Sequence, residues 1–181
     1  MSTHPLIDPI FVSSPHPATL DDEAILKACD LGRGRSSGPG GQHRNRVQTL
    51  VMLTHKPTGV EAHAGERRSA QDNKRVALKR LRFQLALQTR APVPPGDIGS
   101  AMWKSRIKAG KIACNVDHHD YPAMVAEAID VIYDASFDMK RAAVRLDCTQ
   151  SQLIKLLAKE PAALVALNEA RKAKGMGTLR G

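Results

Sequence analysis

Twelve consecutive residues of this chain combine glycine and arginine in a pattern that could support chemistry on a nucleic acid. Residues 35–46 have the sequence RSSGPGGQHRNR, with glycines paired at Gly40 and Gly41. Because glycine has no Cβ, a glycine pair lets the backbone take positive φ values and approach another molecule closely. The following backbone N–H can then be aimed at an oxyanion, while the arginines contact phosphates. On residue types alone, a flexible RNA-binding loop without catalysis is the simpler interpretation.

This segment, with Thr49 after it, resembles the Gly-Gly-Gln (GGQ) loop of class I peptide chain release factors and of the related ribosome-rescue hydrolases. The resemblance continues through residues 53–60 (LTHKPTGV) and 66–74 (ERRSAQDNK), which are similar to the hairpin and the helix start of that catalytic domain. It covers about residues 20–90 and leaves the remaining half of the chain outside it. The resemblance implies hydrolysis of the ester that joins a nascent peptide to tRNA, in the peptidyl transferase centre of the ribosome.

The resemblance implies catalytic roles for Gly40, Gly41 and Gln42. The two glycines would give Gln42 an unusual backbone conformation, so that its main-chain N–H stabilises charge on the transition state or on the departing ribose oxygen. The Gln42 side chain would select water as the nucleophile, and in many relatives this glutamine is methylated. No cofactor and no metal is implied, because the ribosome and the tRNA supply the remaining groups. His43 could suggest a general base, but contact with rRNA or with its own loop is the favoured interpretation.

A larger set of polar and basic residues is expected to contact RNA or the ribosome. The set joins the loop to a basic stripe on the helix predicted after it, and comprises Arg33, Arg35, Ser36, Ser37, His43, Arg44, Asn45, Arg46, Arg75, Lys79 and Arg82. The last three recur at helical spacing, for which a solvated charged face is the alternative. Arg44 departs from the family pattern, since many relatives have a small apolar residue such as valine at this place.

The elements that must position the loop follow from the residues around it. Residues 47–54 are rich in β-branched and apolar side chains, and residues 60–63 alternate, while Lys56-Pro57-Thr58-Gly59 supplies a turn between them. This pattern predicts a β-hairpin. Residues 32–46 contain no apolar residue that could anchor them, and they are expected to form one long exposed loop.

A long helix is predicted after the hairpin. Ser69 and Asp72 have the spacing of a capping box, and the residues from 73 to 88 are mostly good helix formers. The apolar positions of this helix repeat at i, i+3 and i+7, which predicts a core-facing stripe of Leu78, Leu81 and Leu85.

The fold class expected from these elements is α+β: a small sheet with a packed long helix and an extended GGQ loop, followed by an all-helical C-terminal region. The expected organisation is a flexible N-terminus (1–19), a release-factor-like GGQ catalytic domain (20–90), a Pro/Gly linker (91–99) and a helical C-terminal region (100–181). Residues 102–114 are basic and ambiguous between strand and helix. Pro122 suits the first turn of a helix whose apolar face comprises Val125, Ala128, Ile129 and Ile132.

The C-terminal region is expected to contain two short helices, residues 139–146 and 150–159, and a last helix from Pro161 to Gly175. Residues 142–157 have the spacing of a helix-turn-helix. Asp147 stands at the turn, and Thr149 with Gln152 can form a capping box. One interpretation is a second RNA contact through Gln150, Gln152 and Lys155, and the favoured one is a small bundle that only packs.

Charge and composition restrict the partner. The 181 residues carry a formal charge of +9, and residues 31–90 alone contain thirteen Lys and Arg against three Asp and Glu. Such a block favours a polyanionic partner, since neutralised phosphates release counterions. The most apolar stretch, residues 123–133, is interrupted by Glu127 and Asp130, which argues against a membrane span. No signal peptide is visible, and three widely spaced cysteines favour buried free thiols and a cytoplasmic location.

Two smaller features are candidates for further sites. Cys114 with His118 and His119 has poor spacing for a metal site, because adjacent histidines rarely converge on one ion and a fourth ligand is not evident. Trp103 lies among basic residues and could stack on a base, although a lone tryptophan is more often a core residue. No role is assigned to it.

The function expected from the sequence is codon-independent hydrolysis of peptidyl-tRNA on stalled ribosomes, by a monomer whose partners are the ribosome and peptidyl-tRNA. Only thirty residues, mostly acidic or proline-rich, precede the loop region, which leaves no room for a stop-codon-reading domain. The last eleven residues contain only four basic side chains, so how stalled ribosomes are chosen stays open. A non-catalytic RNA- or ribosome-binding protein is the alternative, and a DNA-binding regulator ranks below both.

Overall fold

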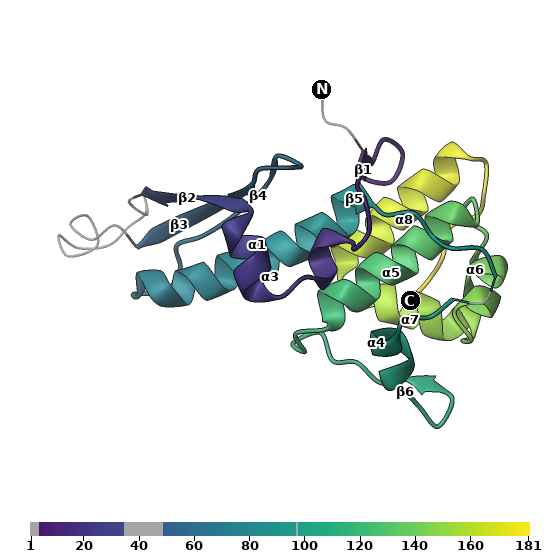
Figure 1. Ribbon diagram of the computed structural model, residues 1–181. Coiled ribbons are helices and arrows are strands. Elements are labelled where there is room, and N and C mark those ends of the chain that lie inside the picture. The colour runs from purple at the N-terminus through teal and green to yellow at the C-terminus, as the bar shows by residue number, and fades with distance from the viewer. Residues whose placement is uncertain (1–3, 35–48, 97) are drawn as a thin grey trace. The chain divides into compact units, whose positions relative to one another are not determined.

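The computed structural model describes residues 4–34, 49–96 and 98–181 (Figure 1). These residues group into two compact units, one of residues 20–85 and one of the residues up to 19 together with 86–181. The first unit contains a three-stranded sheet and helices, and the second is mainly helical. The predicted α+β class with an all-helical C-terminal region is therefore confirmed.

The sheet of the first unit has the order β2-β3-β4 and is antiparallel throughout. Its strands are β2 (Cys29–Gly34), β3 (Leu50–His55) and β4 (Val60–Ala64). Side chains on β4 alternate strictly between buried and exposed, as expected of a strand with one face on the core. The turn between β3 and β4 contains Gly59 at φ +69, which glycine adopts without strain. The predicted hairpin is confirmed.

Strand β2 corrects one expectation from the sequence, because Gly32, Arg33 and Gly34 lie in this strand and not in the loop. They pair with Met52, Val51 and Leu50 of β3. A Cβ on Gly32 would lie 3.0 Å from Met52 Cε, and one on Gly34 would lie 3.1 Å from Leu50 Cδ2. The absence of side chains at the two glycines thus lets the side chains of β3 lie across β2.

Two helices complete this unit, α1 (Asp22–Lys27) and α3 (Ala70–Gln88), and α3 runs along one face of the sheet (Figure 1). The Asp21 carboxylate caps α1 by accepting a hydrogen bond from the Ala24 N–H at 2.7 Å. Ser69 Oγ accepts from the Asp72 N–H at 3.3 Å, at the predicted start of α3. The predicted stripe on α3 is also confirmed, since its three leucines, Leu78, Leu81 and Leu85, are buried.

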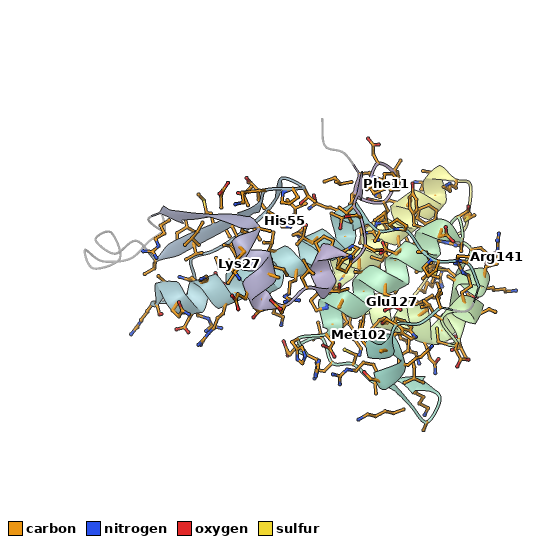
Figure 2. The ribbon with its side chains drawn as sticks, viewed as in Figure 1. Phe11, Lys27, His55, Met102, Glu127 and Arg141 are labelled. Carbon is orange, nitrogen blue, oxygen red and sulfur yellow. The ribbon has the colours of Figure 1, made fainter. Side chains whose placement is uncertain are left out.

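The second unit includes residues 4–19, which we expected to be flexible. They form β1 (Ile10–Phe11), which pairs in parallel with β5 (Thr89–Arg90), and a 3-10 helix, η1 (Pro17–Thr19). Leu6 in this segment is fully buried. Phe11 is a largely exposed side chain of β1 (Figure 2). Its ring makes an edge-on contact with Tyr133, with 6.0 Å between the ring centroids. Long-range pairing thus gives this proline-rich segment defined elements.

Four helices form most of the second unit, and all four agree with the predicted helices: α5 (Tyr121–Asp134), α6 (Met139–Arg145), α7 (Gln150–Ala158) and α8 (Pro161–Ala173). Proline lies in the first turn of α5 and of α8, where its missing N–H costs no helical hydrogen bond. The predicted apolar face of α5 is fully buried, and burial extends around most of the helix.

The ambiguous basic segment contains both kinds of element. A short helix, α4 (Ala101–Ser105), precedes a two-stranded hairpin of β6 (Ile107–Lys108) and β7 (Lys111–Ile112). Trp103 on α4 is fully buried and donates its indole N–H to the Leu146 carbonyl at 2.9 Å. The core interpretation of Trp103 is therefore correct, because its ring has no face open for stacking on a base.

The helix-turn-helix segment contains the expected turn chemistry. Asp147 has φ +48, and Thr149 and Gln152 form the predicted capping box. The Gln152 side chain also donates a hydrogen bond to the Gly110 carbonyl at 2.6 Å, so it is engaged within its own unit.

Among the helices of the described residues, none has both the length and the apolar character that a membrane span requires.

Candidate functional site

The residues expected to carry catalysis connect two strands whose ends are paired. Gly34, the last residue of β2, lies opposite Leu50, the first residue of β3. Residues 35–48, the stretch between them apart from Thr49, lie outside the described residues. This part of the predicted site comprises Arg35, Ser36, Ser37, Gly40, Gly41, Gln42, His43, Arg44, Asn45 and Arg46. The described structure therefore shows the two places where this connection meets the sheet, at Gly34 and at Thr49. We call these two places the base of the connection.

Asn73 of α3 holds the returning end of the connection. Its Nδ2 donates to the Thr49 carbonyl at 2.6 Å and to the Arg67 carbonyl at 2.9 Å. Its Oδ1 accepts from the Arg67 N–H at 2.9 Å. The Asn73 side chain is fully buried, so these three bonds satisfy an amide that has no access to water. The amide links three segments: the start of α3, residue 67 and the residue before β3.

Asn73 was not singled out from the sequence, although a signal for it exists. Residues 73, 77, 81 and 85 follow one another at i+4 spacing, and all four are fully buried. The last three are Ala77, Leu81 and Leu85, so an asparagine stands on the apolar face of the helix. Since buried polar side chains need hydrogen-bond partners, a polar residue in a core stripe indicates an anchoring role.

The four described basic residues of the predicted site have different surroundings. Arg33 lies on β2 immediately before Gly34, and its side chain is exposed. Arg75 and Lys79 are exposed on α3, and Arg75 lies 3.5 Å from the Asp72 carboxylate. Arg82 donates to Asp22 Oδ1 at 2.8 Å, and its side chain is only 13% exposed. The largely buried Arg82 side chain thus belongs to an ion pair with the first turn of α1, whereas the side chains of the other three are exposed.

Two further arginines accompany the base of the connection. Arg67 and Arg68 are exposed and lie in the segment between β4 and α3. This segment is held by Asn73, which binds the Arg67 backbone, and by Arg80, which donates to Glu66 Oε1 at 2.7 Å and to the His63 carbonyl at 2.8 Å. Because the Arg67 backbone shares Asn73 with Thr49, the structure brings this arginine pair to the place where residues 35–48 end.

The buried histidine of the first unit and the cysteines of both units are consistent with structural roles. His55 at the end of β3 is 4% exposed, its Nδ1 lies 2.7 Å from Thr58 Oγ1, and burial lowers its pKa. The three cysteines of the chain, Cys29, Cys114 and Cys148, are free thiols. Burial raises the pKa of each, to about 11 for Cys148, so the protonated form dominates at neutral pH.

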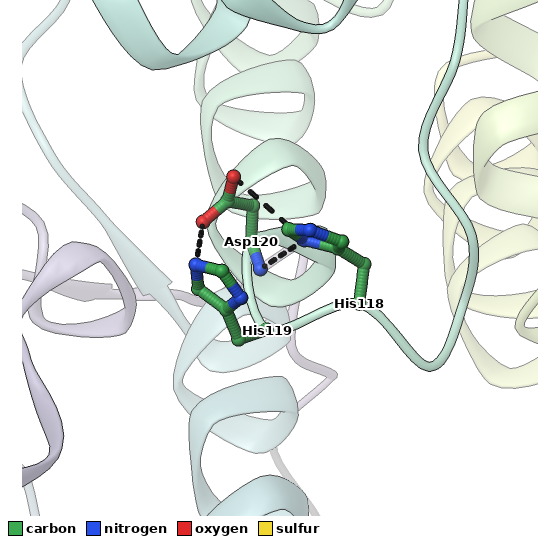
Figure 3. A group of neighbouring side chains, drawn as sticks. All are labelled: His118, His119 and Asp120. Carbon is green, nitrogen blue, oxygen red and sulfur yellow. Dashed lines mark hydrogen bonds and ion pairs between the residues drawn. The ribbon is translucent and has the colours of Figure 1, made fainter.

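The adjacent histidines of the candidate metal site lie immediately before α5, in the second unit. The side chains of His118, His119 and Asp120 offer donor atoms within 4.8 Å of one another (Figure 3). The Asp120 carboxylate, however, already accepts two hydrogen bonds from Arg106, one of them from Nε at 2.8 Å. His118 Nδ1 accepts the Asp120 N–H at 3.1 Å. These groups hold the turn before the helix, and the adjacent guanidinium disfavours a cation.

A cavity of about 410 Å³ lies elsewhere in the second unit, between η1, the segment after β5 and α5. It is lined mainly by apolar side chains, with His16 and Asp130 among the polar ones. Asp130 binds the buried Arg90 at 3.0 Å, and burial raises the pKa of Asp130 to about 7. His16 lies against Thr89, and burial followed by the Arg90 charge lowers its pKa to about 4. Asp130 is thus paired with Arg90, and His16 with Thr89, which is typical of a buried structural network.

Comparison with known proteins relates residues 27–107, most of which belong to the first unit, to peptide chain release factors. Residues 27–107 match the RF-1 domain. The chain is 38% identical over 88 residues to peptide chain release factor 1 of Acidiphilium cryptum, an alignment that covers 49% of this chain and 24% of that protein.

Two further relatives agree. Peptide chain release factor 1 of Mesoplasma florum is 44% identical over 71 residues, which cover 38% of this chain and 20% of that protein. The protein of the same name from Xylella fastidiosa is 30% identical over 116 residues, which cover 55% and 32%. The chain thus spans between a fifth and a third of the length of these relatives, and no solved structure matches it. Residues 27–107, which include β2, β3, β4 and α3, are an RF-1 domain of the class I release factor family.

Proposed function

We propose that this protein hydrolyses the ester bond of peptidyl-tRNA on the ribosome, without reading a stop codon. The observation that carries the proposal is the RF-1 domain of residues 27–107, because Gly40, Gly41 and Gln42 lie within it. The paired ends of β2 and β3 and the Asn73 anchor support it, since they fix both ends of the connection that holds these three residues.

In the proposed reaction, water attacks the carbonyl carbon of the peptidyl ester and the 3′ ribose oxygen of the tRNA leaves with a proton. The Gln42 N–H, freed by the two preceding glycines, donates a hydrogen bond to the oxygen on which negative charge develops. The Gln42 side chain excludes larger nucleophiles. Loss of one such donor costs about 3–4 kcal/mol of barrier, which is a rate about 100- to 1000-fold lower.

The ribosome and the peptidyl-tRNA are the proposed partners, and the protein acts as a monomer in the cytoplasm. Arg33, Arg75 and Lys79 are the described basic residues proposed to contact rRNA, together with Arg67 and Arg68 at the base of the connection. Their exposed charges suit phosphate contacts, which position a protein on RNA. Arg82 was predicted for this role as well, but its ion pair with Asp22 competes with a phosphate contact.

The test measures release of labelled peptide from purified ribosomes that carry peptidyl-tRNA in the P site. Three complexes are compared, with no codon, a sense codon or a stop codon in the A site. We expect release from the complex without a codon and no dependence on a stop codon. If the protein binds ribosomes but releases no peptide from any complex, catalysis is excluded and the non-catalytic binding protein is correct.

A glycine variant tests the role of the loop. Gly41→Ala is expected to lower the release rate about 100- to 1000-fold, because a Cβ there opposes the backbone conformation that aims the Gln42 N–H. Gly177→Ala is the matched control, since a Cβ at Gly177 would meet nothing within 4 Å. Equal rates for the two variants would remove the glycine pair from the mechanism.

A further inference from the structure

The amide of Asn73 is placed where it can determine how residues 35–48 return to the fold. Thr49 directly follows these residues and directly precedes β3, and its carbonyl oxygen accepts from Asn73 Nδ2 at 2.6 Å. The orientation of the Thr49 peptide is therefore set by a side chain on α3 as well as by the sheet. The other end of the connection is set by the pairing of Gly34 with Leu50.

The three hydrogen bonds at this position can be made by the side chain of asparagine but not by that of aspartate or alanine. Two backbone carbonyls need donors and one backbone N–H needs an acceptor, and the Asn73 amide supplies all three with its two N–H groups and its oxygen. Aspartate has the same shape but no N–H, so a carboxylate would face two carbonyl oxygens. Alanine would leave all three backbone groups without this partner in a site that has no solvent access at Asn73.

We propose that Asn73 is a positioning residue for peptide release. By holding Thr49 and Arg67 to α3, it fixes the end of the segment that contains Gly40, Gly41 and Gln42 and keeps the Arg67–Arg68 pair beside that end. This inference rests on the proposed function, because the effect of positioning is measured as release. Small misplacements of a catalytic group are costly, since about 1 Å can lower a rate about 100-fold.

The experiment compares Asn73→Ala with Leu81→Ala in the full chain. Leu81 lies on the same face of α3 and is fully buried, so its truncation destabilises the unit while leaving the three bonds of Asn73 in place. Peptide release is measured over a range of protein concentrations, at a temperature where circular dichroism shows both variants folded. This separates the maximal rate from the concentration that gives half of it.

We expect Asn73→Ala to lower the maximal release rate about 10- to 100-fold, with the half-saturating concentration unchanged within about 2-fold. Leu81→Ala should keep the maximal rate of the unmodified chain. Hydrogen exchange gives a readout that does not depend on ribosomes. The Arg67 N–H, which donates to Asn73 Oδ1, should exchange faster in Asn73→Ala than in Leu81→Ala.

Asn73→Ser keeps the test decisive if the alanine variant does not fold. A serine hydroxyl can serve one of the two carbonyls, so its maximal rate should lie between those of Asn73→Ala and the unmodified chain. Maximal rates for the Asn73 variants equal to that of Leu81→Ala would overturn the positioning role and leave the proposed function intact. No release by the unmodified chain would overturn the proposed function and, with it, this inference.

Discussion

The buried histidine of the second unit gives a pH dependence whose sign and size follow from its contacts. His16 is 6% exposed, and its Nδ1 accepts the Ala18 N–H at 3.0 Å. Its Nε2 lies 3.2 Å from the Thr89 carbonyl oxygen, to which it can donate only as N–H. These two bonds are compatible with the neutral ring protonated at Nε2. A second proton, on Nδ1, would remove the acceptor of the Ala18 N–H and place an N–H donor of the ring against it.

The free energy of unfolding should therefore fall as the pH falls. Burial, and after it the charge of Arg90, lowers the pKa of His16 from 6.5 to about 4. Above pH 6.5 the ring is neutral in the folded and the unfolded chain, so its full contribution to stability is present. Between pH 6.5 and about 4 the unfolded chain binds a proton that the folded chain does not. Stability is then lost at up to about 1.4 kcal/mol per pH unit, with a total of about 3 kcal/mol.

The perturbation is His16→Asn, which keeps a side-chain oxygen near the Ala18 N–H but does not titrate. Asp130 titrates with the opposite sign, because burial raises its pKa to about 7 and the stability linked to it is lost as the pH rises. Since Asp130 is present in both proteins, the difference between their unfolding free energies isolates His16. Urea unfolding can be followed by the fluorescence of Trp103, the single tryptophan, which is buried in the same unit.

We expect the stability advantage of the unmodified chain over His16→Asn to be largest at pH 7.5 and to shrink steadily down to pH 4.5. The slope should approach about 1.4 kcal/mol per pH unit below pH 6. A difference that stays constant over this range would refute the reasoning, because it would mean that His16 binds its proton equally well in the folded and the unfolded chain.

Two further outcomes follow from other contacts of the second unit. Arg90 and Asp130 form a buried ion pair at 3.0 Å, so Arg90→Met and Asp130→Leu should each cost about 3–5 kcal/mol, while the double variant should cost clearly less than their sum. Additive losses in urea unfolding at pH 7.5 would show that the pair is not coupled. Asp147 has φ +48, so Asp147→Ala should be less stable than Asp147→Gly by about 1 kcal/mol. Equal melting temperatures of the two variants would show that the turn changes to a backbone conformation that alanine adopts without strain.

The elements that the sequence predicted well are those that depend on local patterns. The hairpin of β3 and β4 follows from alternation and a four-residue turn, and the helices from apolar periodicity and caps such as Ser69. Strand β2 was missed, because glycine and arginine are uncommon in strands and its order comes from pairing with β3. Arg33 was accordingly expected in a loop and lies on a strand.

The contacts that determine the partners of individual side chains join residues far apart in the sequence. No local sequence pattern predicts these partners. Arg82 pairs with Asp22, sixty positions away, although helical spacing places it with Arg75 and Lys79. Asn73 reaches Thr49 across 24 positions, and His16 reaches Thr89 across 73. The motif that resembles the release factors could be found from the sequence, and the asparagine on the apolar face of α3 could have been, whereas the partners of that asparagine required the fold.

In the proposed function, the two kinds of residue at this site have different physical tasks, which explains why they differ in type. The proposed donor, the Gln42 N–H, would act inside the ribosome, so its position would not come from packing within its own protein. Its position relative to the domain must be specified where the connection meets the fold, at the Gly34–Leu50 pair and at Thr49. Paired strands and a buried side-chain amide suit this task, since their hydrogen bonds are directional and every donor and acceptor of the amide that the bonds require has a partner. For the proposed function, glycine and arginine suit the segment that holds Gly40, Gly41 and Gln42, and a buried asparagine suits the point where this segment meets the fold.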